Sequence, residues 1–340
     1  MSATSDPNRV AVVIPCHNEE PSIAQVISDF RKALPEAIIV VADNASTDRT
    51  ASIASELGAY VVPVPQLGKG RAVRKLFSDV DADIYVLADG DGECDPSAAP
   101  TMVGMVASGT YEMVIGKRMT DPELQQYRRG HRLGNAILTW IFQKLFELEI
   151  TDTLSGYRAM SRRLVKTLPS RSVGFEIEAE LNAHGAIIDV PVAEVPTAFI
   201  GRPHGDSSKL STYKDGWRIL RLNLRLFRDA RPTLAFTLLS TPWLLATAWC
   251  LLVVLRNYAD AGMVVSLPNL IGGFVFFMVA LMLMIAGLMM ERITRNRNEA
   301  VLLAFLAQPS ARPISSSTKP GATDIRTQLA RPERFTHQAG

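Results

Sequence analysis

The acidic residues Asp89, Asp91 and Glu93 are the first candidates for chemistry in this 340-residue chain. They are spaced two apart with a glycine between each pair, and they follow the apolar run 84–88, which is typical of a buried strand. In an extended segment, side chains at this spacing point the same way, so three carboxylates repel one another unless a cation lies between them. Oxygen ligands favour a hard ion, and the pattern therefore predicts a site for Mg²⁺ or Mn²⁺ that substrate phosphates can share. An acidic surface turn is the alternative, because Asp and Gly dominate turns.

The segments around these acids alternate between short apolar runs and helix-like stretches. The apolar runs predict strands near residues 9–14, 37–42, 59–64, 84–88 and 111–116. This alternation predicts an α/β fold with a mostly parallel, doubly wound sheet. Ligands bind such sheets beyond the carboxyl ends of the strands. Because the polar clusters 15–20, 43–48 and 89–95 all follow strand ends, we expect them to form one composite site.

Two further polar segments allow both a structural and a ligand-binding interpretation. Residues 43–48, Asp-Asn-Ala-Ser-Thr-Asp, contain good helix-capping residues, but two carboxylates exceed the needs of a cap. Residues 68–71, Gly-Lys-Gly-Arg, lack the P-loop pattern and could form a plain turn. A glycine turn with Lys69 and Arg71 at the start of a helix also suits a phosphate.

Four motifs in this order resemble the family 2 glycosyltransferases. They are Val-Val-Ile-Pro-Cys-His-Asn-Glu-Glu at 12–20, Asp-Asn-Ala-Ser-Thr-Asp at 43–48, Gly-Lys-Gly at 68–70 and Asp-Gly-Asp at 89–91. The resemblance implies a glycosyltransferase A-type domain that binds a nucleotide sugar and a metal ion. It implies that the nucleotide sugar contacts Pro15, Asn18, Glu19, Asp43, Lys69 and Asp89. It implies that the ion is held by Asp89 and Asp91, with Glu93 as a further ligand.

The middle of the chain carries a motif of a narrower branch. Residues 152–158, Asp-Thr-Leu-Ser-Gly-Tyr-Arg, resemble a motif of the polyprenyl-phosphate sugar transferases, the dolichol-phosphate mannosyltransferase branch. Residues 201–209 resemble the Arg-x-x-Gly-x-Ser-Lys loop of that branch. The resemblance implies catalytic roles for Asp89, Asp91, Arg118, Asp152 and Arg202. It implies contacts with an acceptor phosphate from Arg118, Arg132, Ser155, Arg202 and Lys209.

Two details of this middle region stay open. Residues 152–158 could instead form a turn with a capping Asp and a required Gly. A helix is expected to start within residues 174–180, with acids in its first turn. We expect Glu176 of this segment to face the site without a catalytic role.

Hydrophobic residues make up 47% of the chain, and the apolar excess lies after residue 232. On a helical plot of residues 211–231, Arg218, Arg221, Arg225 and Arg228 fall within one arc, which suits an amphipathic helix at a membrane interface. A helix buried against the preceding domain is the alternative. Residues 233–255 and 268–290 carry no charge and are long enough to span a bilayer. Arginines flank this hairpin while its link holds only Arg256, so the positive-inside rule places both ends in the cytoplasm.

Composition restricts the compartment and the partners. A net charge of +2 gives no polyanion signature, so we expect no nucleic-acid partner. The three cysteines lie far apart, which argues against a zinc site or disulfides and fits a reducing compartment. Residues 1–9 lack the apolar core of a signal peptide. We therefore expect a cytoplasmic domain at 1–210 on the inner membrane and a disordered tail at 308–340.

These features predict an inverting, metal-dependent transferase. It would move a sugar from a UDP- or GDP-linked donor to a polyprenyl phosphate at the cytoplasmic face of the membrane, and a second copy of the chain is an optional partner. A transferase that acts on a glycan or another lipid is one alternative. A catalytically silent membrane scaffold is the other, and the intact Asp89 and Asp91 argue against it. Glucose, mannose, a hexosamine and a uronic acid all stay open as the sugar.

Overall fold

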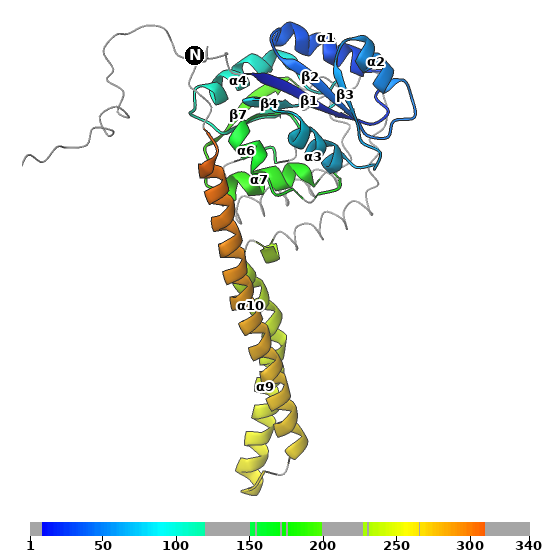
Figure 1. Cartoon of the computed structure of the whole chain (residues 1–340). Coiled ribbons are helices and arrows are strands. Elements are labelled where there is room, and N and C mark those ends of the chain that lie inside the picture. Colours follow the sequence, from blue (N-terminus) through cyan, green and yellow to red (C-terminus); the bar gives the residue numbers. More distant parts are fainter. Residues whose placement is uncertain are drawn as a thin grey trace, which may run out of the picture.

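The computed structural model describes residues 9–119, 150–153, 155–170, 172–174, 176–198, 227–229, 231–264 and 266–309. It consists of a domain built on one sheet and a long helical hairpin (Figure 1). Some expectations lie outside the described residues. These are the site residues Arg132, Arg202 and Lys209, the domain boundary at residue 210, most of the helix at 211–231 and the tail from residue 310.

A seven-stranded sheet forms the centre of the domain, in the order β3-β2-β1-β4-β6-β5-β7. The strands are β1 (Val10–Cys16), β2 (Ile38–Asp43), β3 (Tyr60–Pro63), β4 (Ile84–Leu87), β5 (Met113–Met119), β6 (Arg158–Ser161) and β7 (Val192–Ala198). Neighbouring strands are parallel except for β6, which runs antiparallel to both β4 and β5. The predicted α/β fold with a mostly parallel sheet is confirmed, and the five expected strands are present. The sequence analysis did not anticipate β6 and β7.

Helices cover both faces of the sheet (Figure 1). On one face lie α1 (Ile23–Ala33), α2 (Thr50–Glu56), the short 3₁₀ helix η1 (Pro96–Ala98) and α4 (Ala99–Ala107). On the other lie α3 (Lys69–Asp79), α6 (Arg162–Lys166) and α7 (Ile177–Ile187). Each face has its own buried core, and successive residues of β1 and β4 enter the two cores alternately. Because both faces are buried, these strands are continuous apolar runs in the sequence.

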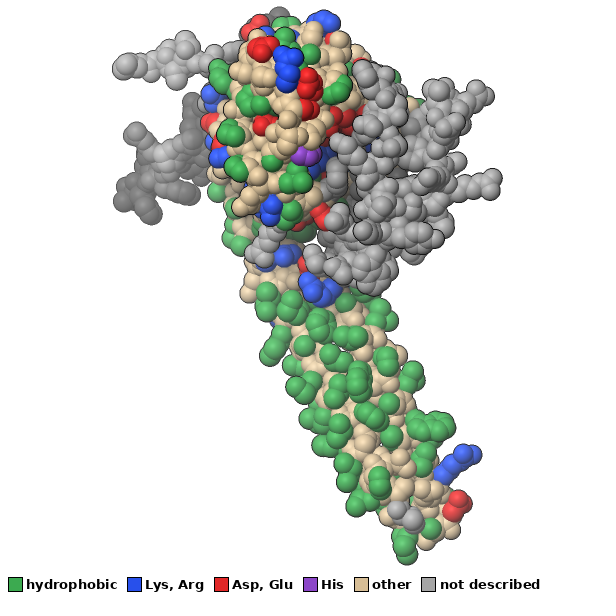
Figure 2. Space-filling model, turned by 90° about the vertical axis from the view of Figure 1, so that its right-hand side faces the viewer, with side chains coloured by type: hydrophobic (Ala, Val, Ile, Leu, Met, Phe, Trp, Pro, Cys, Tyr) green, Lys and Arg blue, Asp and Glu red, His purple; other side chains and the backbone are tan. Residues whose placement is uncertain are grey.

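The hairpin consists of α9 (Pro232–Ala261) and α10 (Leu267–Ala307), which pack side by side. Both helices are long and apolar enough to cross a membrane, judged by length and composition. Figure 2 shows apolar side chains over the outer surface of this rod, with charged side chains near its two ends. The expected spans 233–255 and 268–290 lie inside these helices. Both helices are longer than the expected spans, and α9 ends at a turn where Gly262 adopts a left-handed φ of 69°.

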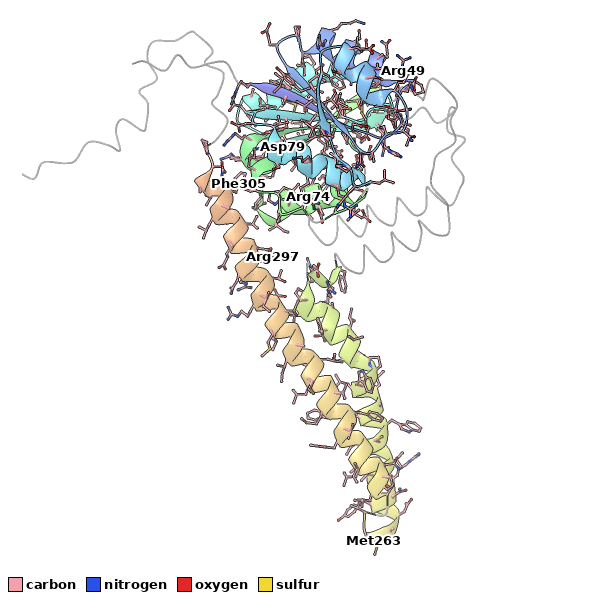
Figure 3. All side chains as sticks on the ribbon, turned by 45° about the vertical axis from the view of Figure 1, so that its right-hand side comes forward. Arg49, Arg74, Asp79, Met263, Arg297 and Phe305 are labelled. Atoms are coloured by element: carbon pink, nitrogen blue, oxygen red, sulfur yellow. The ribbon has the colours of Figure 1, made fainter. Side chains whose placement is uncertain are left out.

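The end of α10 contacts the sheet domain. Phe305 is 5% exposed and belongs to the core beneath α3, α6 and α7. The guanidinium of Arg163 lies 4.5 Å from the centroid of its ring, and Arg162 donates a hydrogen bond to Gln308 at 3.2 Å. Arg162 also forms an ion pair with Asp81, just before β4 begins. Figure 3 shows Phe305 near the end of α3. The hairpin therefore holds the domain at the edge where the parallel strands start.

Replacing Phe305 with alanine is expected to release the end of α10 from the domain. Core Phe→Ala changes cost about 3–5 kcal/mol, so this local contact should open far more often. We expect trypsin to cleave at Arg292, Arg295 or Arg297 at least about tenfold faster. Leu303→Ala is the matched control, because Leu303 lies on the same helix and is 67% exposed. Equal cleavage rates in the two variants would contradict the docking of Phe305.

Candidate functional site

Asn44 joins the ends of β1, β2 and β3 through its side chain and its backbone amide. This side chain is buried, donates to the carbonyl oxygens of Val64 and Gln66 at 3.2 and 2.7 Å, and accepts from the Gly68 amide at 2.6 Å. The backbone amide of Asn44 donates to the carbonyl of Cys16, the last residue of β1, at 2.8 Å. Because one residue joins three strand ends, this edge of the sheet is braced. Gly90 lies against Cys16, where an added Cβ would be 2.5 Å from Sγ, so the polar clusters 15–20, 43–48 and 89–95 meet at this edge as expected.

The residues expected to contact the nucleotide brace this same surface. Asn18 has a φ of 56°, and its side chain accepts a hydrogen bond from the Thr47 amide at 2.8 Å. Asp43 accepts from the Ser46 amide at 3.2 Å. The Glu19 amide donates to the Thr50 hydroxyl at 2.9 Å, and Pro15 lies within β1. Their contacts with a nucleotide stay a prediction.

The acidic segment after β4 makes this edge strongly negative. Burial raises the pKa of the Cys16 thiol well above its usual value, and nearby carboxylates raise it further. These carboxylates belong to Glu19, Asp89, Asp43 and Asp91. A negative edge of this kind suits a cation.

The three acids expected as ligands do not form a closed protein cage. Asp91 accepts a hydrogen bond from the Glu93 amide at 3.2 Å. Within the described part of the chain, no three His, Cys, Asp or Glu side chains form a group that could hold a metal. Mg²⁺ commonly binds through one or two carboxylates together with substrate phosphates and water. The donor set therefore fits an ion whose coordination the substrate completes, and the set of three ligands stays a prediction.

Lys69 lies between two carboxylates at this edge. Its Nζ is 2.6 Å from Asp89 Oδ1 and 2.6 Å from Glu178 Oε1. Burial by itself would lower the pKa of Lys69, but the charges and hydrogen bonds of Asp89 and Glu178 raise it well above its usual value. The two carboxylates therefore favour the charged form of Lys69 and hold its ammonium beside Asp89.

The glycines around Lys69 are required by close packing. A Cβ on Gly68 would lie 2.2 Å from the Val173 carbonyl oxygen, and one on Gly70 would lie 2.6 Å from that of Ser172. The Gly70 amide already donates to Val173 at 3.1 Å. The predicted phosphate role of this turn therefore rests on Lys69 and not on the Gly70 amide.

A second ion pair joins Arg118, near the carboxyl end of β5, to Asp152. Nε and Nη2 of Arg118 each donate to one carboxylate oxygen at 2.9 Å. Burial by itself would raise the pKa of Asp152, but the hydrogen bonds and charge of Arg118 hold it below the usual range. Asp152 is thus a weak base that fixes the direction of Arg118.

The rest of the segment 152–158 serves mainly as a support. Ser155 is buried, and its hydroxyl donates to the Gly116 carbonyl at 2.6 Å. Arg158 is fully buried, contacts Asn182, and donates to the carbonyl oxygens of Ser155 and Thr153. Burial lowers the pKa of its guanidinium to about 10. Both side chains hold the segment in place, and a contact of Ser155 with an acceptor phosphate stays a prediction.

Comparison with known proteins decides the family. Residues 11–168 match the sequence profile of glycosyl transferase family 2. The glycosyltransferase AglJ of Haloferax volcanii is 35% identical over 226 residues, which are 66% of this chain and 73% of AglJ. The chain belongs to glycosyl transferase family 2.

Two further proteins are similar to this glycosyltransferase. A dolichyl-phosphate hexose transferase of Haloferax volcanii is 29% identical over 208 residues, which cover 61% of this chain and 89% of the relative. Glucosyl-3-phosphoglycerate synthase from Mycobacterium tuberculosis has been solved in complex with Mn²⁺, UDP-glucose and phosphoglyceric acid. That structure matches with a TM-score of 0.52 and 25% identity, over 65% of this chain and 80% of its own. Family membership makes this chain a glycosyltransferase, and it shares the glycosyltransferase A-type fold of the solved structure.

The structure brings some predicted residues together and adds others. Asp89 and Lys69 are in contact, as are Arg118 and Asp152. Glu176, which we expected to face the site, accepts a hydrogen bond from the Gly174 amide at the start of α7. Instead, the acid of α7 that contacts Lys69 is Glu178, which was not predicted from the sequence. Glu178 lies in the first turn of α7, where acidic residues commonly stabilise the helix dipole, so its place in the sequence did not indicate a role in the site.

Replacing Gly156 with alanine is expected to disturb the pair of Asp89 and Lys69. The added Cβ would lie 2.6 Å from Asp89 Oδ2 and 3.1 Å from Lys69 Nζ. A displacement of about 1 Å at a site of this kind can cost about 100-fold in turnover. We expect a loss of this order in the release of nucleoside diphosphate from the donor, with the fold retained.

Gly104→Ala is the matched control for this change. Gly104 lies within α4, and a Cβ there would have no neighbour within 4 Å. The control should keep full turnover. Full turnover of Gly156→Ala as well would show that Gly156 does not approach the two charged side chains in the working enzyme.

Proposed function

We propose that this glycosyltransferase moves a sugar from a nucleoside diphosphate donor to a polyprenyl phosphate at a membrane surface. The observation that carries the proposal is the hairpin of α9 and α10, whose apolar side chains face outward below the sheet domain (Figure 2). A soluble helix pair would bury these side chains. An enzyme whose acceptor is dissolved in lipid needs such an anchor, whereas one with a soluble acceptor does not.

The donor would bind at the carboxyl edge of β1, β2 and β4. Mn²⁺ and UDP-glucose accompany the related glucosyl-3-phosphoglycerate synthase in its solved structure, which supports a diphosphate donor and a divalent ion here. Asp89 and Asp91 would hold Mg²⁺ or Mn²⁺ together with diphosphate oxygens. The loops braced by Asn44, with Pro15, Asn18, Glu19 and Asp43, would hold the nucleoside. A UDP- and a GDP-linked donor fit equally.

The acceptor phosphate would bind on the Arg118 side of the site. The relative named as a dolichyl-phosphate hexose transferase supports a lipid phosphate as the acceptor class. Asp152 fixes the guanidinium of Arg118 through two hydrogen bonds, so the positive charge of Arg118 is held in one direction near the site. Arg132, Arg202 and Lys209 would add further positive charge.

The reaction needs little proton transfer from the protein. A phosphate oxygen of the acceptor attacks the anomeric carbon, the bond from that carbon to the donor diphosphate breaks, and the configuration inverts. The attacking oxygen is already anionic, so a strong general base is unnecessary, which agrees with the lowered pKa of Asp152. The divalent ion, when bound, supplies charge neutralisation for the leaving diphosphate. Lys69 and Arg118 hold the two reacting phosphate groups in place.

The proposal places the enzyme on the cytoplasmic face of the inner membrane. Arg292, Arg295 and Arg297 follow the apolar part of α10, whereas Arg256 is the one arginine between 232 and 291. Nucleotide-sugar donors would then meet the site from the cytoplasm. A glycan or another lipid as acceptor remains the second candidate, and two spans alone do not readily build a channel for a growing glycan.

An acceptor assay tests the proposal. Detergent-purified full-length protein is incubated with a panel of UDP- and GDP-linked sugars, with and without a short-chain polyprenyl phosphate. We expect one donor to yield a sugar-linked lipid that partitions into organic solvent, because the acceptor carries the lipid chain. The matching polyprenol, without phosphate, is the control and should yield no product. Transfer to the polyprenol, or to neither lipid, would contradict a phosphate acceptor.

Asp91→Asn tests the metal dependence. The change removes one ligand charge without altering the shape of the side chain, so we expect turnover to fall at least about 100-fold with the fold retained. EDTA should abolish the turnover of the unchanged protein, and added Mg²⁺ or Mn²⁺ should restore it. Asp79→Asn is the control, because Asp79 pairs with Lys75 on the outer surface of α3. Full turnover in excess EDTA would rule out an essential divalent ion.

A further inference from the structure

Glu178, Lys69 and Asp89 form a row of three charged side chains, and their exposure to solvent increases from Glu178 to Asp89. The Glu178 side chain is 4% exposed, Lys69 is 12% exposed and Asp89 is 31% exposed. The ammonium of Lys69 contacts one oxygen of each carboxylate at 2.6 Å. Asp89 is therefore accessible to a substrate, whereas Glu178 is too deeply buried to contact one.

Asp89 cannot keep this arrangement unchanged when it binds an ion. A carboxylate that becomes a metal ligand loses much of its attraction for a neighbouring ammonium. Leaving a buried ammonium without a charged partner is strongly unfavourable. The ammonium therefore needs a carboxylate that stays in place when Asp89 turns to the ion.

The second oxygen of Glu178 provides for this exchange. Oε2 is buried and has no hydrogen-bond partner. An ammonium group carries three donors, so the one that now points to Asp89 can move to this oxygen. Lys69 would then be held by both oxygens of Glu178.

We propose that Glu178 is a positioning residue that retains the Lys69 ammonium while Asp89 binds the divalent ion of the donor complex. Glu178 touches no substrate and acts through Lys69. It lowers the cost of separating Lys69 from Asp89, and it keeps the ammonium beside the diphosphate. The inference rests on the proposed function, because it assumes that Asp89 binds an ion.

The test measures the affinity for Mn²⁺ directly. Full-length protein in detergent is titrated with Mn²⁺ in the presence of UDP and, separately, GDP, and the free ion is followed by electron paramagnetic resonance. In Glu178→Gln, Lys69 keeps Asp89 as its charged partner in this row, so the ion must compete with it. We expect the affinity for Mn²⁺ to fall about tenfold, as for the loss of a charged hydrogen-bond partner.

A double variant separates this role from a structural one. Lys69→Met removes both the competing ammonium and its contact with the diphosphate, so adding Glu178→Gln to the Lys69→Met protein should cause no further loss of affinity for Mn²⁺. Turnover of the double variant should stay low, because Lys69 is absent. Glu180→Gln, on the same helix, is the matched control, because Glu180 accepts from the Ser172 amide and should leave the affinity unchanged.

The outcomes distinguish the inference from the function on which it rests. An unchanged affinity in Glu178→Gln overturns the inference alone, provided that the unchanged protein binds Mn²⁺. A loss of about tenfold that persists when Glu178→Gln is added to the Lys69→Met protein also overturns it, because Glu178 then acts through another neighbour such as Arg158. If the unchanged protein binds no Mn²⁺ with either nucleotide, the proposed metal dependence fails, and the inference fails with it.

Discussion

The antiparallel pairing of β6 with β4 and β5 is the contact on which the site depends. In this register Arg158, the first residue of β6, lies opposite Leu87, the last residue of β4, and opposite Ile115, within β5. A parallel strand at this place would bring its last residues to the site edge. The reversed strand brings its first residues instead, and with them the segment 152–157. One reversed strand therefore inserts this segment between Asp89 on one side and Arg118 on the other.

Two cations, Arg158 and Lys69, hold this arrangement rigid, although removing them from water is unfavourable in free energy. Arg158 contacts Asn182 and backbone carbonyl oxygens beneath the segment, and Lys69 is enclosed by carboxylates at its edge. Charges taken out of water are tolerated only with well-placed partners, so each cation restricts the positions of the groups around it. The hydrogen bonds of Arg158 thus fix the backbone of the segment, and the ion pair of Lys69 and Asp89 lies against it. This explains why Ser155, for which the family resemblance implies a role, and Arg158, the last residue of the same motif, are both fully enclosed.

The fold was largely predictable because β1, β2 and β4 are buried on both faces and are continuous apolar runs. The polar clusters at their ends followed from the topology of parallel sheets. By contrast, β6 could not be predicted, because Arg-Ala-Met-Ser contains a fully buried arginine whose side-chain contact Asn182 lies 24 residues away in the sequence. Glu178 was missed for a similar reason. Its sequence neighbours are typical of a helix start, and only the packing of α7 against α3 brings it to Lys69. The family resemblance supplied roles for Arg118 and Asp152, but not the ion pair between them.

The continuity of α10 has a mechanical consequence. From Glu291 to Phe305 the helix rises about 20 Å, at about 1.5 Å per residue, and it ends in the core of the sheet domain. In the proposed membrane arrangement, helices respond to a thinner or thicker bilayer by changing their tilt. A change of about 10° over this length would move the docking point by roughly 4 Å, which exceeds the length of a hydrogen bond. The thickness of the surrounding bilayer would then set the height of the catalytic edge above the lipid headgroups. A change in lipid composition would therefore change how closely the site approaches a lipid acceptor.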